Sequence, residues 1–445
     1  MGSRSQAQAE CGEKRVASDA FAEVKSTSPV ISESQSPTQP QSPNSVTSDG
    51  GLLAKLQVLA CFLVLMNTWG IVNTFGAYQS FYEVDLLRSH SPSAISWIGS
   101  FQAFLLFLVS VLTGPIFDAG HTPALLGVGS FLVILGTMMT SLVKTYYQAF
   151  LAQAVCIGLG AGMMFVPSIA IVSTYFDKDR AFAIGVGASG SSFGGIIYPT
   201  IFHELQPRIG FGWATRVIGL IALVTLVIAN LVTRQRVVPA TRRKLFDASA
   251  LREPPFIFCT LGLCFGFIGL YNPFFYITTF ALSKTGASAT LAFYFVPIVN
   301  AASVFGRLAP TALADRVGTL NTLIPCTIIC GALVLAWAAV HSTGALLAFA
   351  LLYGFFSGSF VSLPPSTLVS LSPDLSKVGT RIGMSFGVSS LGVLVGSPVG
   401  GALINLHTGQ FVRMQVFCAV TMFVACAMLV IARVAKSGLV VMAKA

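Results

Sequence analysis

The stretch RQRVVPATRRKLFDASALRE, from Arg234 to Glu253, divides a chain that is otherwise mostly apolar. It carries six basic residues and separates two sets of apolar segments, each near the roughly 20 residues with which an α-helix crosses a bilayer. The sequence predicts spans over 57–81, 94–116, 123–143, 147–172, 181–204 and 212–233 before it, and over 256–281, 289–311, 320–340, 344–369, 382–404 and 411–433 after it. We therefore expect an all-α integral membrane protein with twelve transmembrane helices in two sets of six.

The composition indicates lipid, and not water, as the solvent of most of the chain. Of the 445 residues, 54% are hydrophobic and 9% are charged, whereas about a quarter of an average soluble domain is charged. The net charge is +10, but the basic residues lie in short loops and do not cluster as a nucleic-acid site requires. The nine cysteines are scattered without a metal-binding spacing. We expect no nucleic-acid partner, no metal and no other cofactor.

The segments outside the spans predict the domain organisation and the orientation. Residues 1–51 are rich in Ser, Pro, Gln and Glu and predict a disordered tail. If both termini are cytoplasmic, about 20 of the 26 Lys and Arg residues lie on that side and about six on the other. We therefore expect a plasma-membrane protein with cytoplasmic termini, with the vacuolar membrane as the alternative. The expected parts are a cytoplasmic tail (1–51), a six-helix bundle (52–233), a cytoplasmic hinge (234–253), a second bundle (254–435) and a cytoplasmic C-terminal tail (436–445).

An internal repeat relates the two sets of spans. A shift of 197 residues places Asp118 on Asp315, and a shift of 199 places GIVN (70–73) on GLYN (269–272). Parallel six-helix repeats build transporters whose two bundles rock about a site near the middle of the membrane. A membrane enzyme needs no such symmetry. The repeat therefore favours a transporter in which the two bundles are structurally similar.

Three runs carry a resemblance to a known family: NTWGIVNTFGAYQSFY (67–82), YFDKDRAFAIGVGASGSSFGG (175–195) and NAASVFGRLAPTALADRVG (300–318). They resemble the monocarboxylate-porter family of the major facilitator superfamily, in particular its fungal members, and the resemblance spans all twelve helices. It implies the major facilitator fold, transport by alternating access and a solute site between the bundles. Fungal members similar to this chain include carriers of monocarboxylates, of riboflavin-like molecules and of products of secondary-metabolite clusters.

Two charged residues of the animal lactate carriers are missing here. Those carriers place a lysine in helix one, where this chain has the region of Gly76, and an aspartate four residues before the helix-eight arginine, where it has Ser303. The arginine itself is present as Arg307. Because proton coupling in such carriers is attributed to the missing pair, proton-linked lactate transport does not carry over, and the proton stays one candidate for the coupling ion.

Five polar residues inside the spans are candidates for the solute pathway. An arginine at the centre of a span costs about 3 kcal/mol or more, so Arg307 either contacts an anionic solute or gate, or snorkels to the cytoplasmic interface. Asn73 and Asn272 match in the repeat, and the proline after Asn272 predicts a break in the seventh span. Each either lines the site or makes an interhelical hydrogen bond. Asn300 and Tyr276 are candidates to donate hydrogen bonds to a solute.

Three charged residues in the short loops are candidates for gating. Asp118, Asp315 and Arg316 match the signature that the superfamily carries in its loop between helices two and three and in the repeat of that loop, where charges bridge helix ends and hold one gate closed. The first copy is degenerate, since Ala119 stands where an arginine is usual. The alternative interpretation is helix capping with cytoplasmic charge.

These patterns predict a secondary transporter, expected to be monomeric, that moves a small organic solute, a monocarboxylate or a related metabolite. Export of a secondary metabolite is the leading hypothesis, and proton-linked uptake of a monocarboxylate or nutrient is the alternative. A transporter-like sensor without flux is the hypothesis from another class, and the short tail and 20-residue hinge argue against it. An enzyme is not expected, because the spans hold almost no converging acids, histidines or reactive cysteines.

Overall fold

The computed structural model describes residues 51–176, 179–236, 246–372, 377–405 and 409–438. The chain divides into two units, 1–46 and 47–445, and every helix belongs to the second. The predicted N-terminal tail up to residue 50, the central part of the hinge and the end of the C-terminal tail lie outside the described residues. The described residues form no β-strand beyond an isolated bridge between Asn405 and Gln410.

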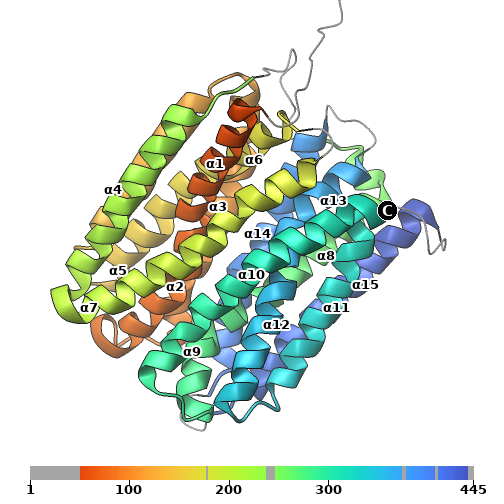
Figure 1. Ribbon diagram of the computed structural model, residues 1–445. Coiled ribbons are helices and arrows are strands. Elements are labelled where there is room, and N and C mark those ends of the chain that lie inside the picture. Colours follow the sequence, from red (N-terminus) through yellow and green to blue (C-terminus); the bar gives the residue numbers. More distant parts are fainter. Residues whose placement is uncertain (1–50, 177–178, 237–245, 373–376, 406–408, 439–445) are drawn as a thin grey trace, which may run out of the picture. The chain divides into compact units, whose positions relative to one another are not determined.

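The helices form two consecutive sets (Figure 1). The first half contains α1 (Leu52–Asn67), α2 (Trp69–Phe81), α3 (Pro92–Asp118), α4 (Thr122–Thr140), α5 (Tyr146–Ala149), α6 (Gly158–Ser173) and α7 (Arg180–Val232). The second half contains α8 (Pro254–Leu270), α9 (Asn272–Lys284), α10 (Ala289–Val317), α11 (Thr319–Trp337), α12 (Thr343–Ser362), α13 (Pro364–Leu371), α14 (Val378–Leu403) and α15 (Val412–Ser437). Short π-helical turns, Tyr82–Leu86 and Phe150–Ile157, and a 3₁₀ turn, Ala250–Arg252, complete the helical structure of the described chain.

The prediction of twelve spans is confirmed once the longest helix is divided. Among the described residues, 11 helices are long and apolar enough to cross a membrane, and one of them runs over 51 residues, Phe182–Val232. At about 1.5 Å per residue it is far longer than a bilayer is thick. Gly210 breaks it with φ 81° and ψ 163°, a left-handed φ that favours glycine. In Figure 1 the two limbs of α7 meet at this corner, at the lower left, and diverge from it.

The two halves pack in a pseudo-symmetric way. Across the boundary between them, α3 packs along α14, and the first limb of α7 packs along α10. The predicted repeat matches α3 with α10 and the first limb of α7 with α14. Each of the two contacts is therefore the counterpart of the other. The spans that begin each half also meet, through α2 and α9. These helices therefore form the boundary between the halves.

Two of the spans are interrupted near their middle. Thr68, with φ −98° and ψ −78°, separates α1 from α2, and Tyr271 separates α8 from α9. Pro273 at the start of α9 cannot donate a backbone hydrogen bond, and the nearby carbonyl of Leu270 accepts one from the Tyr353 hydroxyl at 2.7 Å. The predicted break at Asn272 is confirmed, whereas the break at Thr68 was not predicted.

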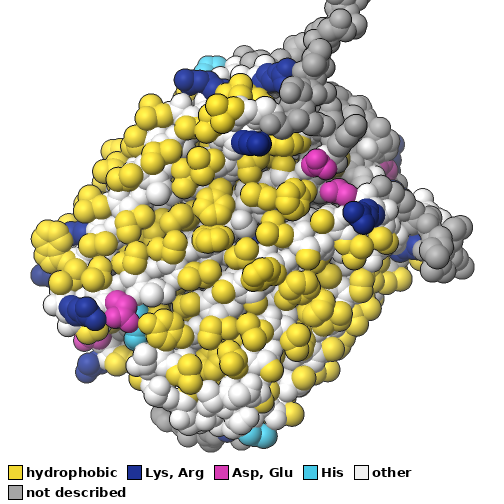
Figure 2. Space-filling model, in the orientation of Figure 1, with side chains coloured by type: hydrophobic (Ala, Val, Ile, Leu, Met, Phe, Trp, Pro, Cys, Tyr) yellow, Lys and Arg dark blue, Asp and Glu magenta, His cyan; other side chains and the backbone are white. Residues whose placement is uncertain are grey.

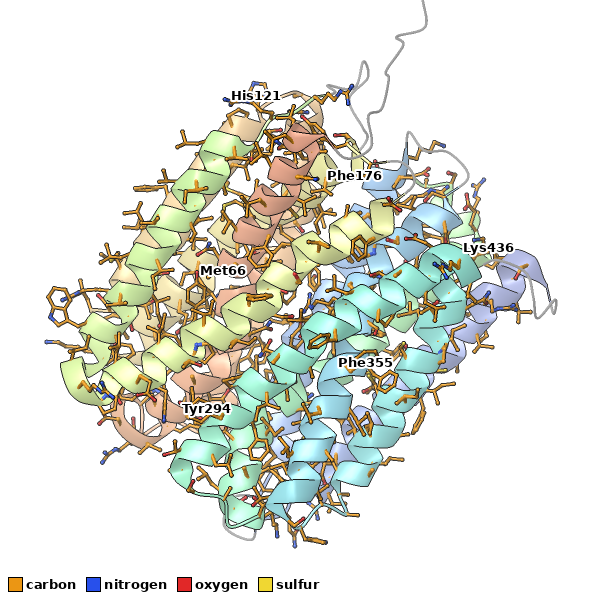
Figure 3. The ribbon with its side chains drawn as sticks, viewed as in Figure 1. Met66, His121, Phe176, Tyr294, Phe355 and Lys436 are labelled. Atoms are coloured by element: carbon orange, nitrogen blue, oxygen red, sulfur yellow. The ribbon has the colours of Figure 1, made fainter. Side chains whose placement is uncertain are left out.

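The outer surface has the pattern of a membrane protein. Figure 2 shows hydrophobic side chains over the middle of the visible face and charged side chains gathered at the two ends of the helices. We call the end of the helix bundle at which α1 begins and α15 ends the terminal end, and the opposite end the far end. Figure 3 shows Tyr294 at the far end and both His121 and Lys436 at the terminal end. Charge at the ends of helices with apolar sides is what a bilayer requires.

Candidate solute-binding site

A row of polar contacts joins α10 of the second half to the first half. Asn73 donates from Nδ2 to Oδ1 of Asn300 at 3.2 Å, and the hydroxyls of Ser192 and Ser303 lie 2.7 Å apart. All four side chains are buried. Gly195 lies so close to Asn300 that an added Cβ would overlap the amide. We call these contacts of α10 with α2 and with the first limb of α7 the seam.

Arg307 continues the seam one helical heptad beyond Asn300, on the same face of α10. Its side chain is 5% exposed, and Nη1 donates to the carbonyl oxygen of Ala188 at 3.2 Å. The Nε atom has no hydrogen-bond partner among the described residues. A buried guanidinium with an unsatisfied donor is costly unless something else accepts from it. The structure therefore joins Asn73 to Asn300 and places Arg307 two helical turns further along the same face of α10.

Arg307 lines a small cavity with aromatic walls. Trp69, Phe107 and Phe165 come from the first half, and Phe267 and Phe386 come from the second. The ring of Phe107 lies 5.0 Å from that of Trp69, measured between centroids, and 5.3 Å from that of Phe267. The cavity volume is about 30 Å³, which is room for a few water molecules. We call these five rings the aromatic box.

The sequence did not predict the aromatic box. Phenylalanine is the commonest aromatic residue of this chain, with 35 copies, and in a membrane span it usually serves packing. Trp69 carried a usable signal, since tryptophan is rare in this chain, with four copies. Ser192 and Ser303 were also missed, because two serines from distant helices show no relation in the sequence.

Asn272 and Tyr276 lie apart from the seam. The Asn272 amide donates to the carbonyl of Ile268 at 3.0 Å, and its Oδ1 packs against Gly400 of α14. The Tyr276 hydroxyl donates to the carbonyl of Ser397 at 3.1 Å. The contacts with Gly400 and Ser397 join α9 to α14 within the second half. The structure thus gives these two residues packing partners of their own.

Tyr276 also lines a much larger cavity, a vestibule at the far end. Its volume is about 610 Å³, and residues from both halves line it. Glu83 and Ser93 come from the first half, and Tyr276, Asn405 and Arg413 come from the second. A space of this size lies within the range of small-molecule sites. The described chain therefore holds an open far-end vestibule and a nearly filled aromatic box.

On the α7 side, two contacts join the halves at the far end. The ring of His203 stacks on that of Phe293 with centroids 3.9 Å apart and 7° between the planes. The Tyr294 hydroxyl, at the far end of α10 in Figure 3, donates to Oε1 of Glu204 at 3.2 Å. These contacts hold the far ends of α7 and α10 together, whereas the vestibule lies beside α3 and α14.

The three predicted gating residues lie at the terminal end. Asp118 is the last residue of α3, and its side chain lies outside the described part of the structure. Asp315 and Arg316 lie in the last turn of α10, and both are exposed. Their role in gating stays a prediction.

The strongest ionic contacts in the described chain centre on Arg381, which the sequence did not single out. This arginine in the first turn of α14 is 2% exposed and forms two hydrogen bonds with the Glu253 carboxylate, at 2.6 and 2.7 Å. Its Nε donates to Asp247 at 3.1 Å. Both carboxylates belong to the end of the predicted hinge. Arg307 is therefore not the sole buried arginine of the spans, and Arg381 fixes the hinge to α14.

Asp247 is held in its charged form. The Ser249 hydroxyl, which donates at 2.5 Å, and then the Ser249 backbone N–H, Arg381 and Lys377 hold the pKa of Asp247 below its ordinary value of 3.8. Partial burial opposes this shift. Hydrogen bonds and positive charge favour the carboxylate over the neutral acid. Asp247 therefore stays ionised at neutral pH.

Comparison with known proteins agrees with this architecture. The family model of the Major Facilitator Superfamily matches residues 58–344 and 310–441. The chain is 46% identical over 377 residues to the MFS-type transporter dbaD of Emericella nidulans, an alignment that covers 84% of this chain and 85% of that protein. It is 37% identical to the Aspyridones efflux protein apdF of the same organism (80% and 73% covered) and 35% identical to the MFS transporter asaE of Aspergillus flavus (94% and 95% covered).

The resemblance to the superfamily is thus confirmed, while the assignment to its monocarboxylate-porter branch stays a prediction. The matches run through both halves of the chain and include the helices of the seam. The chain belongs to the Major Facilitator Superfamily and is a multi-pass membrane transporter of small solutes.

Proposed function

We propose that this chain exports a small organic solute, a product of secondary metabolism, by alternating access. The solute binds between the two halves, at the cavity that Arg307 and the aromatic box line. Both termini face the cytoplasm, and the protein works as a monomer in the plasma membrane. The export hypothesis gains support from the relative named as an efflux protein for aspyridones, which is 37% identical to this chain.

One observation carries this proposal: Arg307 is buried between the halves with a donor that has no partner among the described residues. Among the described residues of the first limb of α7, which lies opposite, the carbonyl of Ala188 accepts from Arg307. A charge in a span is expensive and marks a solute or ion pathway by default. A carboxylate or another anionic oxygen would satisfy the Nε donor, which agrees with the expectation of an acidic solute.

The test compares metabolites inside and outside host cells that lack the gene and then carry wild-type protein, Arg307→Gln or Arg88→Gln. Arg88 serves as the matched control because its side chain is 69% exposed at the far end. We expect at least one metabolite to accumulate inside the deletion strain and to leave the cell again with wild-type protein. Arg307→Gln should lower that export about tenfold, since a hydrogen bond to a charged group contributes about 1.5 to 3 kcal/mol.

The competing outcomes are distinct. Acid-stimulated entry of a radiolabelled monocarboxylate, with no change in the exported metabolites, would replace export by proton-linked uptake. An unchanged metabolite profile without uptake would leave a sensor without flux. Equal loss of export in Arg307→Gln and Arg88→Gln would remove the assigned role of Arg307.

A further inference from the structure

The aromatic box holds two buried donors that lack partners in the described part of the chain. Besides Nε of Arg307, the indole Nε1 of Trp69 has none, and the Trp69 side chain is 3% exposed. Both side chains line the same cavity. Most buried N–H groups in folded proteins are paired, so two orphan donors at one cavity offer hydrogen bonds to an acceptor that enters it.

The other lining groups define what that acceptor is attached to. No acidic side chain lines this cavity in the described structure, so the donors point to an anionic or strongly accepting oxygen of a ligand. Around them stand rings from both halves: Phe386 lies 5.1 Å from Phe107 and 6.0 Å from Phe165, measured between centroids. Flat rings pack best against other flat rings, in offset-stacked or edge-to-face geometry.

Packing alone explains the rings but not the donors. Leucine or phenylalanine at position 69 would fill space in a core without burying an unpaired indole N–H, which destabilises the folded protein. Trp69 also lies parallel to Tyr271 of the second half, with 8° between the rings and 5.7 Å between their centroids. Trp69 thus combines an N–H group that has no partner among the described residues with a place in the wall of an aromatic cavity.

We infer that the transported solute is a planar, conjugated ring compound with an acidic oxygen, bound with its ring in the aromatic box and its oxygen on Arg307 and Trp69. This inference rests on the proposed transport function and adds the class of substrate. The present cavity is too small for such a ring, so the rings that now touch across the two halves must separate to admit it. Ring–ring contacts between the halves are then replaced by ring–solute contacts.

The test uses full-length purified protein and three simple probes. Benzoate has the ring and the charge, cyclohexanecarboxylate has the charge without planarity, and benzamide has the ring without the charge. Binding is measured by calorimetry and by quenching of tryptophan fluorescence. We expect benzoate to bind about tenfold tighter than either other probe, because cyclohexanecarboxylate lacks the stacking and benzamide lacks the charged hydrogen bond.

Variants assign each preference to its residue. Phe386→Leu should reduce the preference for benzoate over cyclohexanecarboxylate and leave the preference over benzamide. Arg307→Gln should reduce the preference for benzoate over benzamide and leave the preference over cyclohexanecarboxylate. Trp69→Phe, which keeps a ring but lacks the N–H, should weaken benzoate binding severalfold. Phe349→Leu is the control, since Phe349 stacks on Trp337 in the second half, away from the cavity. Melting temperatures verify that each variant is folded.

Three results would overturn the inference: equal affinity for benzoate and cyclohexanecarboxylate, equal affinity for benzoate and benzamide, or no saturable binding of benzoate by folded protein at millimolar concentration. The proposed export is judged separately from the metabolite profile of the deletion strain. If export persists without ring selectivity, the inferred substrate class is wrong and the proposed export stands. If the protein selects for the ring but no solute is exported, the proposed export is wrong.

Discussion

Two buried arginines of this transporter have opposite surroundings. Arg381 is satisfied by two carboxylates at 2.6 to 3.1 Å, whereas Arg307 has one carbonyl at 3.2 Å. A buried charge that is fully paired contributes to structure, and removal of its partner is strongly destabilising. A buried charge that is incompletely paired is available to a ligand. The sequence places Arg307 inside a predicted span and Arg381 one residue before another, and it does not show the surroundings of either.

The network around Arg381 predicts a dependence of stability on pH. The pKa of Asp247 is lower in the folded protein than its ordinary value of 3.8, so its contribution to stability is complete above that value and is lost as the pH falls through the folded pKa. Asp247→Asn should therefore lower the melting temperature at pH 7 and have little effect once the wild-type carboxylate is protonated.

The measurement is a series of melting curves of both proteins from neutral to strongly acidic pH. Asp85→Asn is the control, because Asp85 is 59% exposed in a surface ion pair with Arg88, and such pairs contribute about 0 to 1 kcal/mol. A difference between wild type and Asp247→Asn that stays constant down to the lowest pH would contradict the assignment.

At the scale of elements, the broken spans and the small residues decide how closely the two halves approach. α2 begins at Trp69 directly after the break, which places the indole in the aromatic box and Asn73 one turn further at the seam. The first limb of α7 offers glycine and serine on the facing side, so that α10 lies against its backbone. Small residues allow such close packing in membranes, where helices associate without a hydrophobic driving force.

The seam therefore predicts a strong effect for a single methyl group at Gly195. In Gly195→Ala the new Cβ overlaps the side chain of Asn300, so the Asn73–Asn300 hydrogen bond must shift or break. We expect a loss of about 1 to 3 kcal/mol of stability and a clear decrease in export.

Gly127→Ala in α4 is the matched control, because nothing lies within 4 Å of the point that its Cβ would occupy and alanine favours a helix over glycine by about 1 kcal/mol. Thermal melts and metabolite export should be unchanged or slightly improved there. A Gly195→Ala protein as stable and active as Gly127→Ala would show that the seam tolerates separation.

At the scale of the whole transporter, alternating access requires the contacts between the halves to open and close. In this structure the seam is closed along α7 and α10, while a vestibule is open at the far end beside α3 and α14. Rocking of two bundles changes both regions together, because each half moves largely as a rigid body.

A covalent link across the seam should therefore stop transport. The Ser192 and Ser303 hydroxyls lie 2.7 Å apart, so the Ser192→Cys/Ser303→Cys double variant is expected to form a disulfide on oxidation. Export should fall to the background level and return after reduction. The control pair, Asn67→Cys/Thr225→Cys, joins two side chains 2.8 Å apart within the first half. Full export by the oxidised seam variant, with its disulfide verified by mass spectrometry, would show that the seam does not open during transport.

Local features of the sequence were enough to establish the membrane class, the twelve spans, the break at Asn272 and the superfamily. The length of apolar runs, the position of proline and glycine, and the distribution of charge between loops can each be read without knowledge of the packing. The same features pointed to Arg307, Asn73 and Asn300, because polar groups are rare and costly in lipid-spanning segments.

The packing of the two halves decides which of these residues meet, and no local feature of the sequence shows that packing. Asn73 and Asn300 are 227 positions apart and share a hydrogen bond, whereas Asn272, which matches Asn73 in the repeat, packs within the second half. The aromatic box was hidden for the same reason. Its five rings look like any others in an apolar span, and what distinguishes them is a shared cavity and two unpaired donors that only the packing of both halves creates.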